Sequence, residues 1–189
     1  KKYVTKIIIK FMIRVADYII EKLLKEGVET TFTVTGRGAL FLNDAMAKNK
    51  DLNVVCTHHE QGAAFAAIGY AQMKNELGSC IISTGCASTN VITGLLCAWQ
   101  DSIPCIFISG QNTLKETSRH TKLDIRTYGQ QEADIISIVE PITKYAVMLE
   151  DAQKAIYEVE KAIYYARHDK KGPVWIDVPL DIQSARIDP

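Results

Sequence analysis

Short, continuously apolar runs recur along this chain, and each is followed by a segment with helical character. The runs typical of buried strands are TFTV (31–34), NVVC (53–56), SCIIS (79–83), PCIFIS (104–109) and GPVWIDV (172–178), with TKYAVML (143–149) as a further candidate. A strand that is apolar on both faces has to be covered on both faces, which is the situation of a parallel sheet between helices. The alternation predicts an α/β fold with three layers, α/β/α, and a central, mostly parallel sheet.

Helical periodicity fills the intervals between these runs. Residues 14–26 and 151–167 place apolar positions on one face and charges on the other, and the first of these segments stops at Gly27. Further helices are predicted over 39–48, from the HHEQG motif (58–62) to Met73, through TNVITGLLCAW (89–99) and over 131–139. Residues 111–130 are polar and charged and predict a loop.

Composition excludes several classes of protein. The 22 basic and 22 acidic residues balance to a net charge of zero, so no basic stripe favours nucleic acid or a membrane surface. Residues 77–114 carry a single charge, Asp101, but glycines and Pro104 interrupt them, which argues against a membrane span. A length of 189 residues suits one domain. We expect residues 12–189 to form it and residues 1–11 to be an N-terminal extension.

The cysteines indicate a reducing compartment. The chain has five, an odd number, without a CxxC pair, and most lie in apolar segments. This pattern suits buried, reduced thiols better than a disulfide framework. The first residues, KKYVTKIIIKF, have no secretory cleavage site. We therefore expect a cytoplasmic protein.

Polar residues gather directly after the predicted strands, at 35–38, 57–61, 84–90 and 110–112. In open α/β sheets, ligands bind in the crevice at the carboxyl ends of the strands. Glu60 is the main candidate there. Thr57-x-x-Glu60 has the spacing of a helix capping box, a structural role. The helix behind it, GAAFAAIGYA, is small and apolar nearly all round, however, and a carboxyl group beside a buried surface is a good proton donor to a ligand nitrogen.

Other candidate motifs carry weaker signals. His58 and His59 are neighbours that point apart, without a third ligand at metal spacing, so we predict no metal site. Cys86 lies in a strand-to-helix turn, the setting of a nucleophile elbow. G-x-S-x-G is absent there, and no local feature assigns one of the four histidines as its base. A small residue filling a tight turn is the structural alternative. TGRGA (35–39) contains only G-x-G, too little for a dinucleotide fingerprint.

Taken in order, these motifs resemble the N-terminal, pyrimidine-binding (PYR) domain of thiamine-diphosphate-dependent enzymes of the acetolactate synthase-like family. The resemblance extends over about residues 12–189. The stretches that carry it are HHEQGAAFAAIGYAQ (58–72), TGCASTNVITGLLCAWQDSIPCIFISGQ (84–111), QQEADIISIVEPITKYAV (130–147) and GPVWIDVPLDIQ (172–183). It implies the thiamine-diphosphate-binding fold, with the small-residue helix at a subunit interface of a homodimer or homotetramer.

The resemblance also assigns site residues. It implies that Glu60 is catalytic and bonds a ring nitrogen of the cofactor's aminopyrimidine. The turn Val34-Thr35-Gly36 corresponds to the backbone stretch over the pyrimidine, and Gln131 to a glutamine near the reacting centre. The other implied cofactor contacts are Ser83, Cys86 and Asn90.

The implied reaction is decarboxylation of a 2-oxo acid substrate, followed by ligation to a carbonyl acceptor. In the family a separate domain with a GDG motif binds the diphosphate and Mg²⁺, and no GDG occurs here. The resemblance therefore implies a domain that is inactive in isolation and needs the diphosphate-binding domain of another subunit, with FAD an open question. The alternatives are a subunit of a split decarboxylase, a Cys86-dependent α/β hydrolase, and a non-catalytic interaction module.

The chain departs from the acetolactate synthase pattern at several positions near the implied site. Thr35 replaces a proline, Arg37 a small glycine, and Gln130 a phenylalanine that shapes the acceptor pocket. Cys86 and Ala87 replace a proline and a glycine. Glu60 is unchanged among these departures, so the resemblance implies that the cofactor is used. It does not extend to acetolactate as the product.

Overall fold

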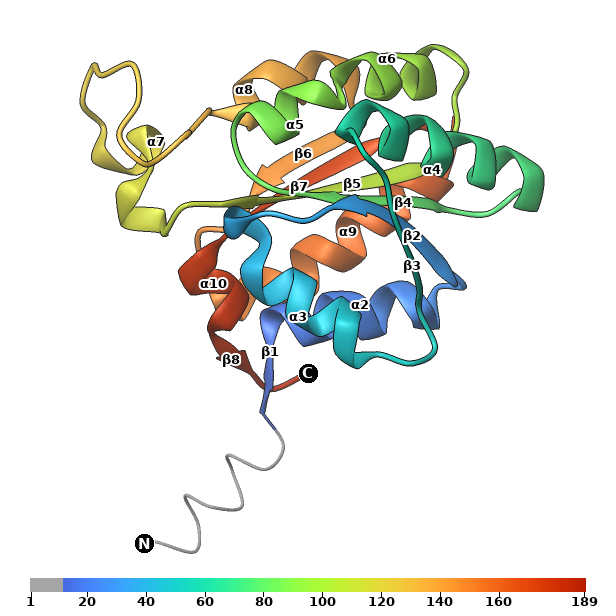
Figure 1. Cartoon of the computed structure of the whole chain (residues 1–189), viewed down its shortest axis with the longest axis horizontal. Helices are drawn as coiled ribbons and strands as arrows, with labels where there is room; N and C mark the ends of the chain where they lie inside the picture. The colour runs from blue at the N-terminus through green and yellow to red at the C-terminus, as the bar shows by residue number, and fades with distance from the viewer. Residues whose placement is uncertain (1–11) are drawn as a thin grey trace, which may run out of the picture.

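A computed structural model describes residues 12–189, and the expectation of an extension at residues 1–11 lies outside this range. Its centre is a sheet of six parallel strands in the order β3-β2-β4-β5-β7-β6 (Figure 1). The strands are β2 (Thr30–Val34), β3 (Asn53–Cys56), β4 (Gly78–Ile82), β5 (Cys105–Gln111), β6 (Tyr145–Met148) and β7 (Val174–Pro179). The predicted α/β class and the predicted strands are confirmed.

Helices cover both faces of the sheet, as the apolar strands require (Figure 1). One layer contains α2 (Val15–Lys25), α3 (Leu40–Lys48), α9 (Ala155–Arg167) and α10 (Leu180–Ser184). The other contains α4 (Glu60–Lys74), α5 (Cys86–Asn90), α6 (Ile92–Gln100) and α8 (Ile135–Val139). The result is the three-layer arrangement that the sequence predicts.

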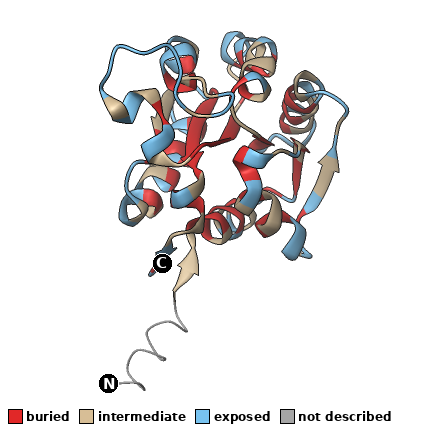
Figure 2. Ribbon diagram, turned by 60° about the vertical axis from the view of Figure 1, so that its left-hand side comes forward, coloured by how far each residue is buried: buried red, intermediate tan, exposed pale blue. Residues whose placement is uncertain are grey.

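Each helical layer has its own hydrophobic core, and the sheet separates the two (Figure 2). Strand β5 shows how one strand serves both, because its side chains alternate between the faces. Ile106 and Ile108 belong to the core under α2 and α9, whereas Phe107 belongs to the core under α4 and α6. Phe107 stacks on Trp175 of β7 with ring centroids 5.6 Å apart.

The small residues of α4 allow close helix packing. A methyl group added at Gly94 of α6 would lie 2.6 Å from Cβ of Ala64 on α4, closer than side chains approach. The outer face of the same pair keeps large apolar side chains in solvent, since Phe65, Leu96 and Trp99 are 43 %, 39 % and 38 % exposed. The helix is therefore buried on one side only.

The predicted loop over 111–130 is partly wrong, because it contains the short helices η2 (Leu114–Glu116) and α7 (Ser118–Thr121). Thr113 and Glu116 form a capping box at η2, and the Thr117 side chain accepts a hydrogen bond from the backbone N–H of His120. The helix predicted over 131–139 begins only at Ile135. Gln131 adopts a left-handed backbone conformation, with φ of 54°, that no helix can contain.

The remaining elements join the ends of the chain and complete the connections. The pair β1 (Ile13–Arg14) and β8 (Arg186–Ile187) is antiparallel and was not predicted. Single 3₁₀ turns precede α3 and α9 and follow α8: η1 (Arg37–Ala39), η4 (Ala152–Lys154) and η3 (Glu140–Ile142). No helix within residues 12–189 combines the length and the apolar character that a membrane crossing requires.

Candidate functional site

A cavity of about 320 Å³ lies at the carboxyl ends of β2 and β4, where the sequence predicts a ligand crevice. Its wall combines the turn after β2, the start of α4, the turn that leads from β4 into α5, and two glutamines of the segment before α8. The lining residues are Thr35, Gly36, Arg37, Gly38, Glu60, Ser83, Thr84, Cys86, Ala87, Asn90, Gln130 and Gln131. Of the eight residues proposed from the sequence, only Val34 does not line it.

Two glycines let the turn after β2 approach the end of β4. A Cβ at Gly36 would lie 2.5 Å from Cβ of Ser83, and one at Gly38 would lie 2.9 Å from Cβ of Thr84. The approach brings the Gly38 N–H to 3.1 Å from Ser83 Oγ, to which it donates. Asn43 holds the same turn from α3 by donating to the Gly36 carbonyl at 3.2 Å. This turn therefore forms one side of the cavity.

The start of α4 differs from the predicted capping box. His59, rather than Thr57, is the capping residue, and its Nδ1 accepts from the Gln61 N–H at 3.1 Å. Thr57 Oγ1 donates instead to the His59 carbonyl at 2.8 Å. Glu60 is consequently the first helical residue, and the capping network does not use its carboxylate.

The Glu60 carboxylate belongs to the cavity and is partly buried. Asn90 of α5 donates from Nδ2 to Glu60 Oε2 at 2.9 Å, across 30 positions of sequence. The other oxygen, Oε1, has no protein hydrogen-bond partner within residues 12–189. One amide thus fixes the orientation of a carboxyl group that keeps the capacity to bond a ligand.

The opposite wall depends on an unusual backbone. Gly85 has φ of 63° and ψ of −120°, which side chains disfavour. A Cβ at this position would lie 1.7 Å from the Gln131 carbonyl oxygen. The turn after β4 therefore packs directly against the backbone of Gln131, and this contact places both segments on the cavity.

Cys86 follows this glycine and is exposed on the cavity. None of the twelve lining residues is a histidine, so the wall offers Cys86 no imidazole base. His58 and His59 are exposed at the start of α4, outside the lining. The arrangement lacks the base of a cysteine hydrolase. Within residues 12–189, no three histidine, cysteine or acidic side chains cluster closely enough to hold a metal ion.

A buried polar network behind the cavity was missed in the sequence. Thr84 Oγ1 donates to Gln111 Oε1 at 2.7 Å, and Gln111 Nε2 donates to Asp177 Oδ2 at 3.1 Å. Ser109 Oγ donates to the other oxygen, Asp177 Oδ1, at 2.6 Å, and accepts from Trp175 Nε1 at 2.9 Å. Burial raises the pKa of Asp177 to about 7, although the bonds from Ser109 and Gln111 oppose the shift. The sequence feature that could have indicated this network was the aspartate inside the apolar run VWIDV.

Comparisons with known proteins identify the family of this chain. Residues 13–138 match the family described as "Thiamine pyrophosphate enzyme, N-terminal TPP binding domain". The chain is 34 % identical over 168 residues, 89 % of its length, to "Acetolactate synthase, chloroplastic" of Arabidopsis thaliana, of which this is 24 %. It is 32 % identical over 172 residues, 91 % of its length, to "Acetolactate synthase large subunit" of Lactococcus lactis, of which this is 28 %. The chain spans about a quarter of the length of the curated relatives it matches.

Proposed function

We propose a function that starts from family membership: the chain belongs to the N-terminal, TPP-binding domains of thiamine pyrophosphate enzymes. The family is the one that the sequence motifs predict. The relatives favour an acetolactate synthase-like protein over a split decarboxylase subunit or a Cys86-dependent hydrolase. We propose that the chain binds the pyrimidine end of thiamine diphosphate in the 320 Å³ cavity, and that the enzyme decarboxylates a 2-oxo acid and ligates the product to a carbonyl acceptor.

The residues of the cavity fit such a ring. Gly36 and Gly38 bring the turn after β2 against Ser83 and Thr84, and this contact closes one side of the cavity. Glu60 offers a free carboxyl oxygen to a ring nitrogen, and the turn of Val34, Thr35 and Gly36 covers the ring. Ser83, Cys86 and Asn90 line the remaining wall, with Gln131 on the substrate side.

The observation that carries the proposal is the Glu60–Asn90 pair. Asn90 holds one oxygen of Glu60 at 2.9 Å, so the second oxygen is presented in a fixed direction. With the cofactor bound, Glu60 would hold a proton toward the ring nitrogen, as a general acid–base group does. When bound, thiamine diphosphate supplies the electron sink for the electron pair left on the carbonyl carbon as carbon dioxide departs.

We propose that the other half of the site comes from a diphosphate-binding domain that holds the diphosphate and Mg²⁺ in another subunit. This makes the chain inactive in isolation as a transferase or lyase, in a homodimer or homotetramer. The exposed Phe65, Leu96 and Trp99 on α4 and α6 support a subunit interface there. The five free cysteines support the cytoplasm as location. The plant relatives carry the word "chloroplastic" in their names.

The substitution Glu60→Gln in the assembled enzyme tests the proposal. The glutamine side chain keeps the size and the bond to Asn90 but cannot exchange a proton, so turnover should fall roughly 100- to 10,000-fold. The matched control is Glu160→Gln on α9, a carboxylate outside the cavity that pairs with Lys22, and it should leave turnover unchanged. Equal turnover of the Glu60→Gln variant and the unmodified enzyme would contradict the proposal.

A further inference from the structure

The cavity wall contains a charged residue that the proposed function does not use. Arg37 is the only basic side chain among the twelve lining residues, and Glu60 is the only acidic one. Arg37 stands in η1, directly after the turn that approaches Ser83. The positive charge therefore belongs to the same hollow as the proposed catalytic carboxylate.

Neutral groups hold the Arg37 guanidinium. Nη1 donates to Asn112 Oδ1 and to Gln130 Oε1, each at 3.3 Å. Within residues 12–189, no carboxylate oxygen lies within 4.0 Å of its nitrogens. Hydrogen bonds from Thr113 lower the pKa of Glu116, and the charge of Arg37 contributes less to this shift. These contacts orient Arg37 without pairing it directly with a carboxylate.

The amide that anchors Arg37 is itself buried and fixed. Asn112 is 1 % exposed, and its Nδ2 donates to the Gln130 carbonyl at 3.0 Å. Its backbone N–H donates to Gln111 Oε1 at 3.0 Å, and Gln111 donates in turn to the buried Asp177. A guanidinium has five N–H donors in a planar fork, and both of these bonds use the same nitrogen. The remaining donors are available to an anion, and the network behind Asn112 sets their direction.

The chemistry of decarboxylation decides which anion suits this position. The carboxylate that reacts has to leave as uncharged carbon dioxide, so an arginine bound to it would stabilise the ground state more than the transition state. A second, non-reacting anionic group keeps its charge throughout the reaction and gains from the arginine at every step. We propose that Arg37 binds a non-reacting carboxylate or phosphate of a substrate, so that the enzyme selects a donor or an acceptor carrying this additional charge.

This inference rests on the proposed function, and two matched pairs of substrates test it in the assembled enzyme. The donor pair is 2-oxoglutarate against 2-oxopentanoate, and the acceptor pair is glyceraldehyde 3-phosphate against glyceraldehyde. Arg37→Ala should lower the preference for the additional charge, as a ratio of kcat/KM, roughly 10- to 100-fold in one pair. Arg37→Lys should restore part of it. The matched control is Arg186→Ala, which removes the same charge from β8, where Arg186 donates to the Met12 carbonyl.

A binding measurement separates this inference from the proposed reaction. Glutarate carries two carboxylates but lacks the 2-oxo group, and its titration requires no turnover. Arg37→Ala should weaken glutarate binding by a similar factor and leave the affinity for thiamine diphosphate unchanged. Unchanged preference in both substrate pairs overturns the inference, as does a loss confined to cofactor affinity, which would assign Arg37 to the diphosphate. If the unmodified enzyme released no carbon dioxide from any 2-oxo acid, the proposed function would fail, and glutarate titration would still decide on the anion site.

Discussion

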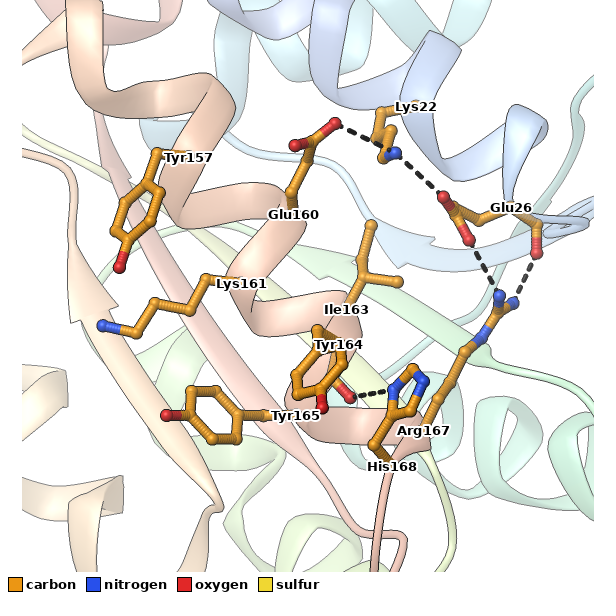
Figure 3. A pocket seen from close by; sticks show the side chains of 10 residues that line it. All are labelled: Lys22, Glu26, Tyr157, Glu160, Lys161, Ile163, Tyr164, Tyr165, Arg167 and His168. Atoms are coloured by element: carbon orange, nitrogen blue, oxygen red, sulfur yellow. Dashed lines mark hydrogen bonds and ion pairs between the residues drawn. The ribbon is translucent and has the colours of Figure 1, made fainter.

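Two hollows of this chain differ in volume and in the partners that hold their charged side chains. The larger one, of about 580 Å³, lies between α2 and α9 and is lined by tyrosines and charged residues (Figure 3). The smaller one, of about 320 Å³, lies at the carboxyl ends of β2 and β4. Volume alone would favour the first as a binding site.

Four charged side chains of the larger hollow, Lys22, Glu26, Glu160 and Arg167, pair with one another (Figure 3). Lys22 pairs with Glu26 at 2.9 Å and with Glu160 at 3.1 Å. Arg167 pairs with Glu26 at 2.8 Å, and Lys161 lies 4.4 Å from the centroid of the Tyr145 ring. A ligand would have to replace these interactions before it gained any.

The smaller hollow contains Glu60 and Arg37, and neutral amides orient both of them. Amides fix the direction of a charged group without neutralising it, so the group stays able to bind a ligand. In this chain, charges held by neutral partners distinguish the proposed site from a hollow of larger volume.

The largest expected effect concerns the backbone of the smaller hollow. Gly85→Ala would place Cβ 1.7 Å from the Gln131 carbonyl oxygen, at a glycine with φ of 63°. Two backbone segments would have to separate, at a cost of at least about 5 kcal/mol in the free energy of unfolding. The measurement is denaturant unfolding. The control is Gly69→Ala on α4, where an added Cβ meets nothing within 4 Å and alanine stabilises the helix by about 1 kcal/mol. Equal stability of the two variants would refute the tight contact.

The second effect is a dependence of stability on pH that comes from Asp177. Burial raises its pKa from 3.8 to about 7, so between these values the folded state binds a proton that the unfolded state has released. The free energy of unfolding should therefore fall as pH rises from about 4 to 7, by at most on the order of 4 kcal/mol. Asp177→Asn should remove this slope in unfolding curves measured across that range.

The control for Asp177 is Asp44, a carboxyl group whose pKa is lowered rather than raised. Hydrogen bonds from Lys48 and Arg14 lower the pKa of Asp44 below 3.8. The stability that ionised Asp44 contributes to the folded state is present above that pH and is lost as pH falls further. Asp44→Asn should leave the slope between pH 4 and 7 intact. A slope that persists in Asp177→Asn would assign the pH dependence to another group.

The smallest effect concerns the larger hollow. Glu26 joins Lys22 and Arg167, and its side chain is 26 % exposed. Glu26→Gln should cost about 1 kcal/mol in the free energy of unfolding, as partly exposed ion pairs do. Turnover of the assembled enzyme should not change. A loss of turnover comparable to that of Glu60→Gln would contradict the claim that only the smaller hollow takes part in the reaction.

Much of the fold could be predicted from the sequence because strands that are buried on both faces appear in it as continuous apolar runs. Val174 to Val178 and Cys105 to Ile108 are fully buried, and both runs were predicted as strands. The small residues of GAAFAAIGYA allow a close approach within the chain, of Gly94 to Ala64, whereas the resemblance implies a subunit interface for this helix.

The wrong predictions concern competition between neighbouring residues and contacts between distant ones. The periodicity of the sequence shows neither. Thr57 and His59 both precede α4, and the capping-box spacing favoured the wrong one, although a histidine Nδ1 accepts the N–H equally well. Gln131 is left-handed because the Gly85 turn packs on its carbonyl, a contact 46 positions away in sequence. The partners of Asp177 come from β5 and became visible only when the strands were paired. Long-range backbone contacts of this kind cannot be derived from one segment at a time.

The central claim is that this chain supplies the pyrimidine half of a shared cofactor site. Calorimetric titration with thiamine diphosphate and Mg²⁺ tests it most directly, first on this chain alone and then with the diphosphate-binding domain added. Binding is expected only in the mixture, because the proposed site on this chain contacts the ring through Glu60 while the other domain holds the diphosphate. Tight binding to this chain alone, or no binding in the mixture, would contradict it.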